Sequence, residues 1–189
     1  MSRRQVVGFV IVLSLIGVAL VLRFRGSSDD DQLVSLRRAA ALQPCPPGLG
    51  ADLPDVRLGC LGGGDAVRLR DRGTGRPTLV NIWGSWCRPC VAEVPTLIGF
   101  ATKAAGRVDV VGIDTEDDPK LALTFAAQYG MRYPSLVDDD KLVLRRYGGG
   151  PPVTLLLDGS GRIRYAHRGQ LHSLAEVEQL VAEHLGVRL

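Results

Sequence analysis

The hydrophobic positions of the chain fall into two patterns from about Ala66 onward. Short, nearly continuous apolar runs, such as TLVNIW, are typical of strands in the middle of a sheet. Longer segments in which apolar residues recur every three or four positions are typical of amphipathic helices. The short runs predict strands at Val67–Leu69, Thr78–Trp83, Val108–Asp114, Val153–Asp158 and Arg162–His167. The sequence GSG between the last two predicts a hairpin.

The amphipathic segments predict helices at Leu33–Gln43, Pro89–Ala105, Asp118–Gly130, Lys141–Tyr147 and Ser173–Gly186. Asp118 and Ser173 stand where helix N-caps are expected, with Glu176 at the capping-box position and Gly130 as a stop. Crossover helices come early and an antiparallel hairpin comes late. The sequence therefore predicts an α/β fold with a central mixed sheet flanked by helices.

A run without charge precedes this alternating region. VVGFVIVLSLIGVALVL, Val6 to Leu22, has roughly 17 residues, the lower limit for a helix that spans a bilayer. It has no polar face, and it ends in VLRFRG with neither an A-x-A cleavage site nor a lipid-accepting cysteine. We therefore expect an uncleaved transmembrane helix at 6–22, a cytoplasmic N-terminus at 1–5 and a polar linker at 23–43. A cleaved signal peptide is the alternative. Arginines flank both ends, so the charges do not decide the orientation.

Composition narrows the classes of function. The chain has 189 residues, of which 46% are hydrophobic, and this excludes a mostly disordered protein. Its net charge is only +3, the basic residues are dispersed, and aromatic residues make up 5%. Nucleic-acid binding is therefore not expected.

The motif that carries chemistry is SWCRPC, in which Cys87 and Cys90 follow the predicted central strand and open the next helix. Unpaired N–H groups and the positive end of the helix dipole stabilise an anion there. The pKa of a cysteine, ordinarily ~8.5, falls to ~3.5–7.5 in such sites, so Cys87 is expected to be a nucleophilic thiolate. Arg88 adds positive charge, and Pro89 suits the first helical turn. Cys90, one turn further in, is placed to resolve a mixed disulfide.

A metal site is disfavoured by the spacing of the other candidate ligands. Cys45 and Cys60 are too far apart in sequence for a zinc knuckle, and no histidine forms one with Cys87 and Cys90. Val91 stands where haem attachment requires histidine. We expect no metal and no organic cofactor.

The remaining polar candidates are assigned no chemistry. Asp114 and the acidic run Glu116–Asp118 end a strand and begin a helix, a common capping arrangement. His167 lies on a predicted hairpin strand and is expected at the surface.

Taken together, WCRPC after a buried strand, Pro95 within the following helix and a Pro-x-Thr strand downstream resemble the thioredoxin superfamily. More closely, the chain resembles the bacterial membrane-anchored TlpA/ResA/CcmG-type thiol-disulfide oxidoreductases, over roughly Asp65 to Leu185. The resemblance implies a thioredoxin-like domain, which we place at 44–189 with an N-terminal extension.

The resemblance also implies roles for individual residues. Cys87 would be the attacking thiol, Cys90 the resolving thiol, and Trp86 the aromatic residue that shields the pair. The segment GGGPPVTLLLD resembles the family's G-x-P-x-T-x-L-I-D pattern. It implies a substrate groove formed by Trp86, Arg88, Pro89, Pro152 and Val153. Pro152 would be the cis-proline, but Pro151 before it departs from the pattern, and the sequence does not decide between them.

Proton handling is expected to differ from that of thioredoxins proper, because Asn81 stands where they carry a buried Asp. Related proteins of the TlpA/ResA type place a Glu three residues after the second cysteine, as Glu93 does here. Glu93 could take the proton from Cys90. The other interpretation is that it only complements the dipole of the helix N-terminus.

Cys45 and Cys60 remain after a functional CxxC pair is set aside, which favours a disulfide between them. Such a bond would staple the N-terminal extension, and it persists only in an oxidising compartment. A secondary redox role for this pair is the less favoured interpretation.

The predicted function is that of an extracytoplasmic thiol-disulfide oxidoreductase. By resemblance it would reduce exported proteins with Cys pairs, such as apocytochrome c before haem attachment, with electrons from a membrane thiol carrier. Two other classes stay open: a general oxidant that forms disulfides in secreted proteins, and a non-enzymatic redox-sensing or metal-binding module.

Overall fold

The structure is a computed structural model, and it describes residues 29–189. The chain divides into two compact units, residues 1–35 and residues 36–189. The predicted anchor at 6–22 and terminus at 1–5 lie outside the described residues. Within 29–189, no helix combines the length and apolar character needed to cross a membrane. Residues 29–40 are helical.

The second unit is built on a seven-stranded mixed sheet with the order β2-β1-β5-β4-β3-β6-β7. The strands are β1 Arg57–Cys60, β2 Val67–Arg68, β3 Thr78–Trp83, β4 Asp109–Thr115, β5 Ser135–Asp138, β6 Val153–Leu157 and β7 Ile163–Arg168. Strands β3, β4 and β5 are parallel, so their carboxyl ends meet at one edge. Strands β6 and β7 are antiparallel additions next to β3, and β1 and β2 are antiparallel additions next to β5.

Every residue of strand β3 is buried, as is every residue of its neighbour β6. Strand β3 pairs with β4 on one side and β6 on the other, with Asn81 opposite Gly112 and Thr154. Successive side chains of a strand point to opposite faces. Val80 and Ile82 therefore face one side of the sheet, and Asn81 and Trp83 face the other.

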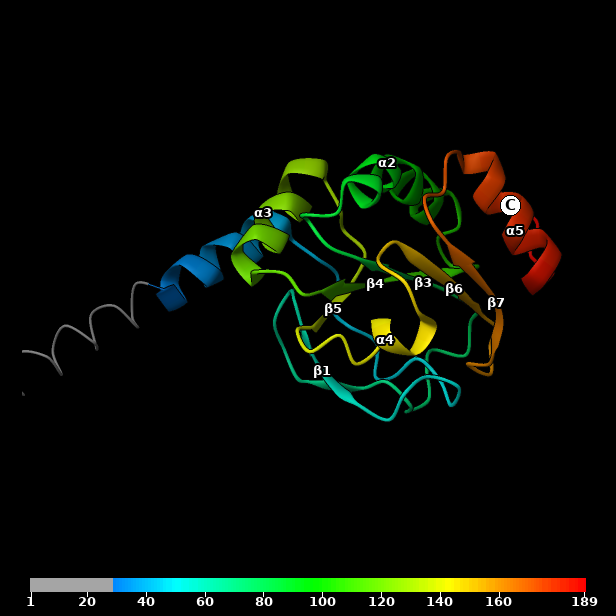
Figure 1. Cartoon of the computed structure of the whole chain (residues 1–189), viewed down its shortest axis with the longest axis horizontal. Coiled ribbons are helices and arrows are strands. Elements are labelled where there is room, and N and C mark those ends of the chain that lie inside the picture. Colours follow the sequence, from blue (N-terminus) through cyan, green and yellow to red (C-terminus); the bar gives the residue numbers. More distant parts are fainter. Residues whose placement is uncertain (1–28) are drawn as a thin grey trace, which may run out of the picture. The chain divides into compact units, whose positions relative to one another are not determined.

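Helices lie on both faces of the sheet (Figure 1). They are α2 Arg88–Lys103, α3 Pro119–Tyr129, α4 Leu144–Tyr147 and α5 Leu174–Leu185. Helices α2, α3 and α5 cover the face of Asn81 and Trp83. The ring of Trp83 stacks on Phe125 of α3 at a centroid distance of 5.3 Å.

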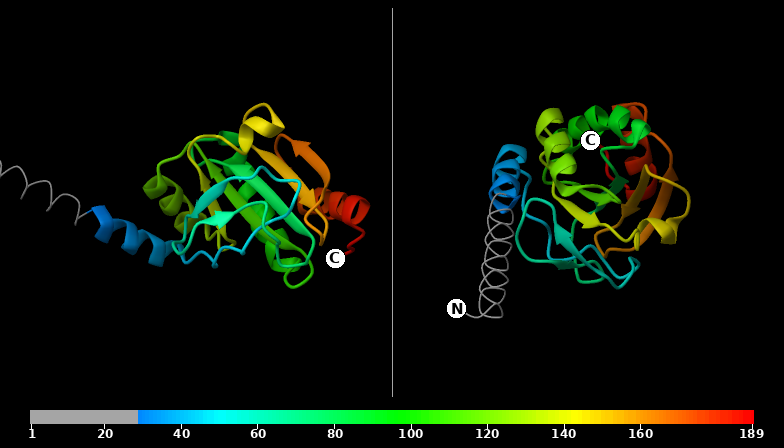
Figure 2. Two further views of the ribbon diagram at one scale, coloured as in Figure 1. Left: turned by 90° about the horizontal axis from the view of Figure 1, so that it is seen from below. Right: turned by 60° about the vertical axis from the view of Figure 1, so that its left-hand side comes forward.

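The other face carries the apolar core. The segment between residues 41 and 75 crosses this face, as the view from below shows (Figure 2). It contributes Leu49, Leu53 and Leu58, which pack with Val80 and Ile82. The N-terminal extension is therefore part of the folded domain, because its side chains cover one of the two faces of the central sheet.

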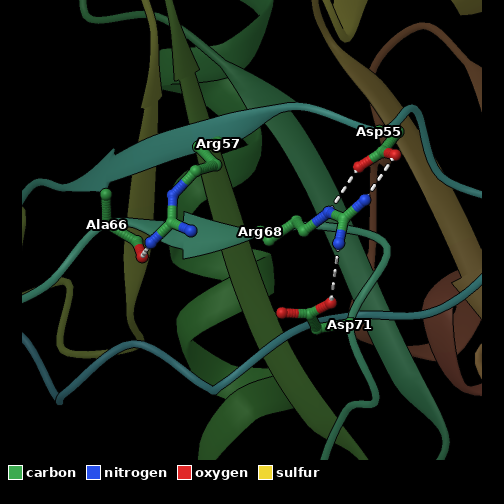
Figure 3. A network of polar contacts seen from close by, with 5 residues as sticks. All are labelled: Asp55, Arg57, Ala66, Arg68 and Asp71. Atoms are coloured by element: carbon green, nitrogen blue, oxygen red, sulfur yellow. Dashed lines mark hydrogen bonds and ion pairs between the residues drawn. The ribbon is translucent and has the colours of Figure 1, made fainter.

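The exposed edge of this extension is held by the hairpin of β1 and β2 (Figure 3). Arg68 donates two hydrogen bonds to the Asp55 carboxylate, at 2.6 and 2.7 Å, and its guanidinium lies 4.0 Å from Asp71. Arg57 donates to the carbonyl of Ala66 at 3.2 Å. These contacts are solvent-exposed and add little free energy, but the bidentate pair fixes the geometry of the hairpin.

The structure confirms the mixed α/β order and corrects several elements. Strands β1 and β5 were not predicted, since four residues are too few for a clear period. The predicted helix 141–147 is wrong in its first turn. Lys141 has a left-handed φ of 56°, and the Asp138 carboxylate accepts the N–H groups of the three residues that follow Lys141. Of the helix predicted at 33–43, residues 33–40 are helical and residues 41–43 are not.

The caps predicted from sequence are present, with one difference. Asp118 accepts the N–H of Lys120, and Gly130 ends α3 at a φ of 70°. Ser173 caps α5 through the N–H of Glu176, but the Glu176 carboxylate accepts the N–H of His172 rather than that of Ser173.

Gly112 offers a test of the packing on the helix-covered face. A Cβ atom there would lie 2.3 Å from Ser135 Oγ and 2.7 Å from Trp83 Nε1, both buried. We expect Gly112→Ala to lower the free energy of unfolding by about 1–3 kcal/mol in urea denaturation, because overpacking displaces one of these side chains. Gly59 in β1 is the matched control, since a Cβ there meets nothing within 4 Å. Equal losses for both variants would contradict this account.

Candidate active site

The site is built at the carboxyl end of β3, where the chain turns into α2. Cys87 and Cys90 are joined by a disulfide. Cys87 is the N-cap residue of α2, and its sulfur accepts the N–H of Cys90 at 3.3 Å. Pro89 lies in the first turn. The sulfur that sequence analysis expects as the nucleophile is therefore bound to one of the free N–H groups at the helix N-terminus.

The cis peptide bond lies between Pro151 and Pro152, so Pro152 is the cis-proline. The sulfur of Cys87 lies 3.4 Å from the carbonyl oxygen of Pro151. The expected juxtaposition of this loop with the cysteines is present, and the contact is made by the backbone of the residue before the cis-proline.

The residues expected to line a substrate groove differ in exposure. Trp86 is 51% exposed, and Arg88 and Pro89 are also at the surface. Pro152 is buried, and Val153 is completely buried within the apolar core. The exposed side chains beside Cys87 are therefore those of Trp86, Arg88 and Pro89, whereas Val153 offers no exposed side chain.

Glu93 lies on α2 one turn after Cys90, on the same side of the helix. It is completely buried, and its two carboxylate oxygens accept hydrogen bonds from Asn81 Nδ2 at 2.8 Å and from the N–H of Leu171 at 2.9 Å. Burial raises the pKa of Glu93 to about 7, against the opposing effect of these two hydrogen bonds, and the negative charge of Glu176 adds to the rise. The carboxyl group is therefore poised to gain or lose a proton near neutral pH.

The partners that hold Glu93 are not predicted by the sequence. Asn81 also donates to Thr154 Oγ1 of β6 at 3.1 Å, and Leu171 comes from the loop before α5. These contacts join residues 12, 73 and 78 positions apart. A polar residue in the apolar run TLVNIW was the only signal in the sequence.

A second disulfide joins Cys45 to Cys60. Cys60 lies in β1 next to β5, and the sulfur of Cys45 lies 3.5 Å from the carbonyl of Ser135 in β5. The bond thus links the start of the extension to the sheet. All four cysteines are in disulfides, and within residues 29–189 no three His, Cys, Asp or Glu side chains are grouped as metal ligands.

A family model described as redoxin matches residues 49–182, which is more than half of the chain. The chain belongs to the redoxin family. This redoxin is 38% identical over 127 residues to the thiol:disulfide interchange protein DsbE homolog of Paracoccus denitrificans, covering 65% of this chain and 68% of that one. It is 30% identical over 183 residues to thiol:disulfide interchange protein DsbE of Escherichia coli, covering 95% and 93%.

Solved structures agree with this assignment. A crystal structure of a putative thiol:disulfide interchange protein DsbE from Chlorobium tepidum is 28% identical, with a TM-score of 0.61 over 71% of this chain and 95% of that one. The thioredoxin-like fold predicted from the sequence is therefore confirmed. With the Cys87–Cys90 pair, these relatives identify this redoxin as a thiol-disulfide oxidoreductase.

The buried carboxyl group of Glu93 predicts a pH-dependent stability. In the unfolded chain it ionises near its ordinary pKa of 4.5, and in the folded protein near 7, so the folded state binds the extra proton between these values. Stability is then lost as the pH rises from about 5 to 8. In Glu93→Gln this loss is expected to shrink by roughly 2 kcal/mol.

The measurement is urea denaturation of the oxidised protein at pH 5 and pH 8. Any constant cost of the amide, which lacks one acceptor oxygen, cancels in the comparison. Glu183→Gln, at an exposed position of α5, is the control and should follow the wild type. An unchanged pH dependence in Glu93→Gln would contradict the raised pKa.

Proposed function

We propose that this redoxin is a membrane-anchored reductant that acts on disulfides of exported proteins, with its catalytic domain outside the cytoplasm. The observation that carries the proposal is the Cys87–Cys90 disulfide at the N-terminus of α2, with Glu93 buried one turn behind it. The uncharged run at 6–22 would be the anchor. The Cys45–Cys60 disulfide supports an oxidising compartment, where it would act as a structural staple.

The first step is attack by the Cys87 thiolate on one sulfur of a substrate disulfide. A bond forms between Cys87 and that sulfur, and the other substrate sulfur leaves as a thiolate. The N–H of Cys90 and the dipole of α2 stabilise the attacking anion. The exposed Trp86, Arg88 and Pro89 would contact the substrate around the mixed disulfide.

The second step is resolution by Cys90. Its thiol gives a proton to the Glu93 carboxylate, and the resulting thiolate attacks the sulfur of Cys87. The Cys87–Cys90 disulfide forms, and the substrate leaves with both of its sulfurs reduced. A pKa near 7 suits Glu93 to this role. At neutral pH a large fraction of the carboxyl group is ionised and can accept the proton, and the protonated form can give it up again.

The substrate class is proposed from the relatives. The DsbE proteins of Paracoccus denitrificans and Escherichia coli are thiol:disulfide interchange proteins. By its resemblance to the cytochrome c maturation type, the chain would reduce the Cys pair of apocytochrome c. Electrons would come from a thiol carrier in the membrane.

The direction of electron flow is tested by the equilibrium reduction potential of Cys87–Cys90 in the full chain. We expect a value near ~−270 mV or lower, typical of reductants, and a value near ~−120 mV would instead indicate a disulfide-forming oxidant. Mass spectrometry after alkylation follows Cys45–Cys60 separately, so that the measured potential belongs to the active-site pair.

A further inference from the structure

The loop that leads into Cys87 is held by a neighbouring loop. Gly84 to Cys87 form a turn closed by the Cys87 N–H, which donates to the carbonyl of Gly84 at 3.1 Å. Ser85 and Trp86 are the two central residues of this turn. Their polar groups bind the last residue of β4 and the segment between β4 and α3.

Asp117 makes the principal contact. Its carboxylate accepts the N–H of Ser85 at 2.5 Å and the hydroxyl of Ser85 at 3.0 Å. The indole N–H of Trp86 donates to the carbonyl of Thr115 at 3.3 Å. Because the two oxygens of Asp117 accept from the backbone and from the side chain of Ser85, they fix both parts of that residue. Hydrogen bonds to a charged acceptor are stronger than those between neutral groups.

Asp114 lies beneath this contact, at the end of β4 and in register with Trp83. It is 1% exposed, and neither of its oxygens has a hydrogen-bond partner in the part of the chain that the structure describes. The charged groups that act on it are Asp117, from the loop after its own strand, and Asp139, from the loop after β5. Its register partner in β3 is the uncharged Trp83.

Burial, and after it the negative charges of Asp117 and Asp139, raise the pKa of Asp114 to about 9. At neutral pH the buried acid is therefore uncharged and does not repel the Asp117 carboxylate. Ionised Asp114 would repel Asp117 inside the low-dielectric edge of the sheet.

The outer side of the same segment is also constrained. Glu116 has a left-handed φ of 53°, Lys141 has one of 56°, and their side chains form an ion pair at 2.5 Å. Thr115 Oγ1 donates to the carbonyl of Asp138 at 3.3 Å. The segment that carries Asp117 is thus bound to the loop after β5, and this holds Asp117 in place as the partner of Ser85.

We propose that Asp117 is a positioning residue for Cys87. It holds the turn Gly84–Cys87 so that the sulfur sits on the free N–H groups of α2. Asp114, buried at the end of β4, affects the same turn through Asp117. The sulfur of Cys87 accepts the N–H of Cys90, so both acids act on the chemistry through the geometry of the turn.

The test compares Asp117→Ala with Asp117→Asn in a Cys90→Ser background of the full chain, where Cys87 is the only free thiol. Both variants remove the charge, but the amide oxygen of Asn can still accept from Ser85. We expect the alkylation rate of Cys87 by iodoacetamide at pH 6.5 to be at least about threefold lower in Ala than in Asn, because the misplaced thiol has a higher pKa. Equal rates would overturn the proposal.

Asp118→Ala is the matched control. Asp118 is the adjacent acid and caps α3 through the N–H of Lys120 at 2.7 Å. Its removal should lower thermal stability and leave the alkylation rate of Cys87 as in the parent. A loss of rate equal to that of Asp117→Ala would mean that loosening the segment suffices, which contradicts a specific role for Asp117.

The role of Asp114 is tested by measuring the alkylation rate of Cys87 as a function of pH, up to pH 10. In the parent, the rate should reach a plateau when Cys87 is fully ionised and then change near pH 9, where Asp114 ionises. Asp114→Asn, which imitates the uncharged acid, should keep its plateau to pH 10. A break that persists in Asp114→Asn, or a parent with no break, would contradict this part of the proposal.

Discussion

The hydrogen-bond donors left free at the amino end of α2 are the constraint on which the rest of the site depends. A helix cannot satisfy its first N–H groups internally, and here the sulfur of Cys87 accepts one of them. This requires β3 to end, the chain to turn and the helix to start within a few residues. The buried, fully paired β3 makes that junction rigid. The cis-proline loop after α4 then places a carbonyl against the same sulfur.

The two faces of the sheet bury different kinds of side chain. The face that the N-terminal extension covers carries the apolar core, and the Cys45–Cys60 disulfide adds a covalent link to this packing. The face under α2 and α3 buries Asn81, Asp114 and Thr154 of the sheet together with Glu93 of α2. Buried polar groups cost free energy unless they are fully paired, and Asp114 is not. Buried polar groups with unsatisfied hydrogen bonds or shifted pKa values are concentrated at functional sites, where they transfer protons or position a reactive residue.

The N-terminal extension shows how an addition to a fold can become part of its core. Leu49, Leu53 and Leu58 replace solvent over one face of the sheet. A disulfide to β1 ties the start of this segment to the strand beside β5. The Cys87–Cys90 pair lies at the N-terminus of α2, which covers the other face of the sheet.

The amino-acid sequence by itself determined the features that follow from local physics. Apolar runs and caps placed β3, α2, α3 and α5, and the position of Cys87 before Pro89 predicted a cysteine at a helix N-terminus. Short strands such as β1 and β5 were missed, because four residues form a strand only when a neighbour pairs with them. Which proline is cis was likewise left to the structure.

Only the tertiary structure decided which groups act together. Asn81 and Leu171 meet Glu93, and Asp117 meets Ser85 across 32 residues, because the sheet brings the loops at its edge side by side. The local sequence predicts Asp114 as part of a capping arrangement, but its side chain is buried. The physical reason is that local patterns record how a segment folds, whereas the pKa of a carboxyl group depends on burial and on charges that other segments supply.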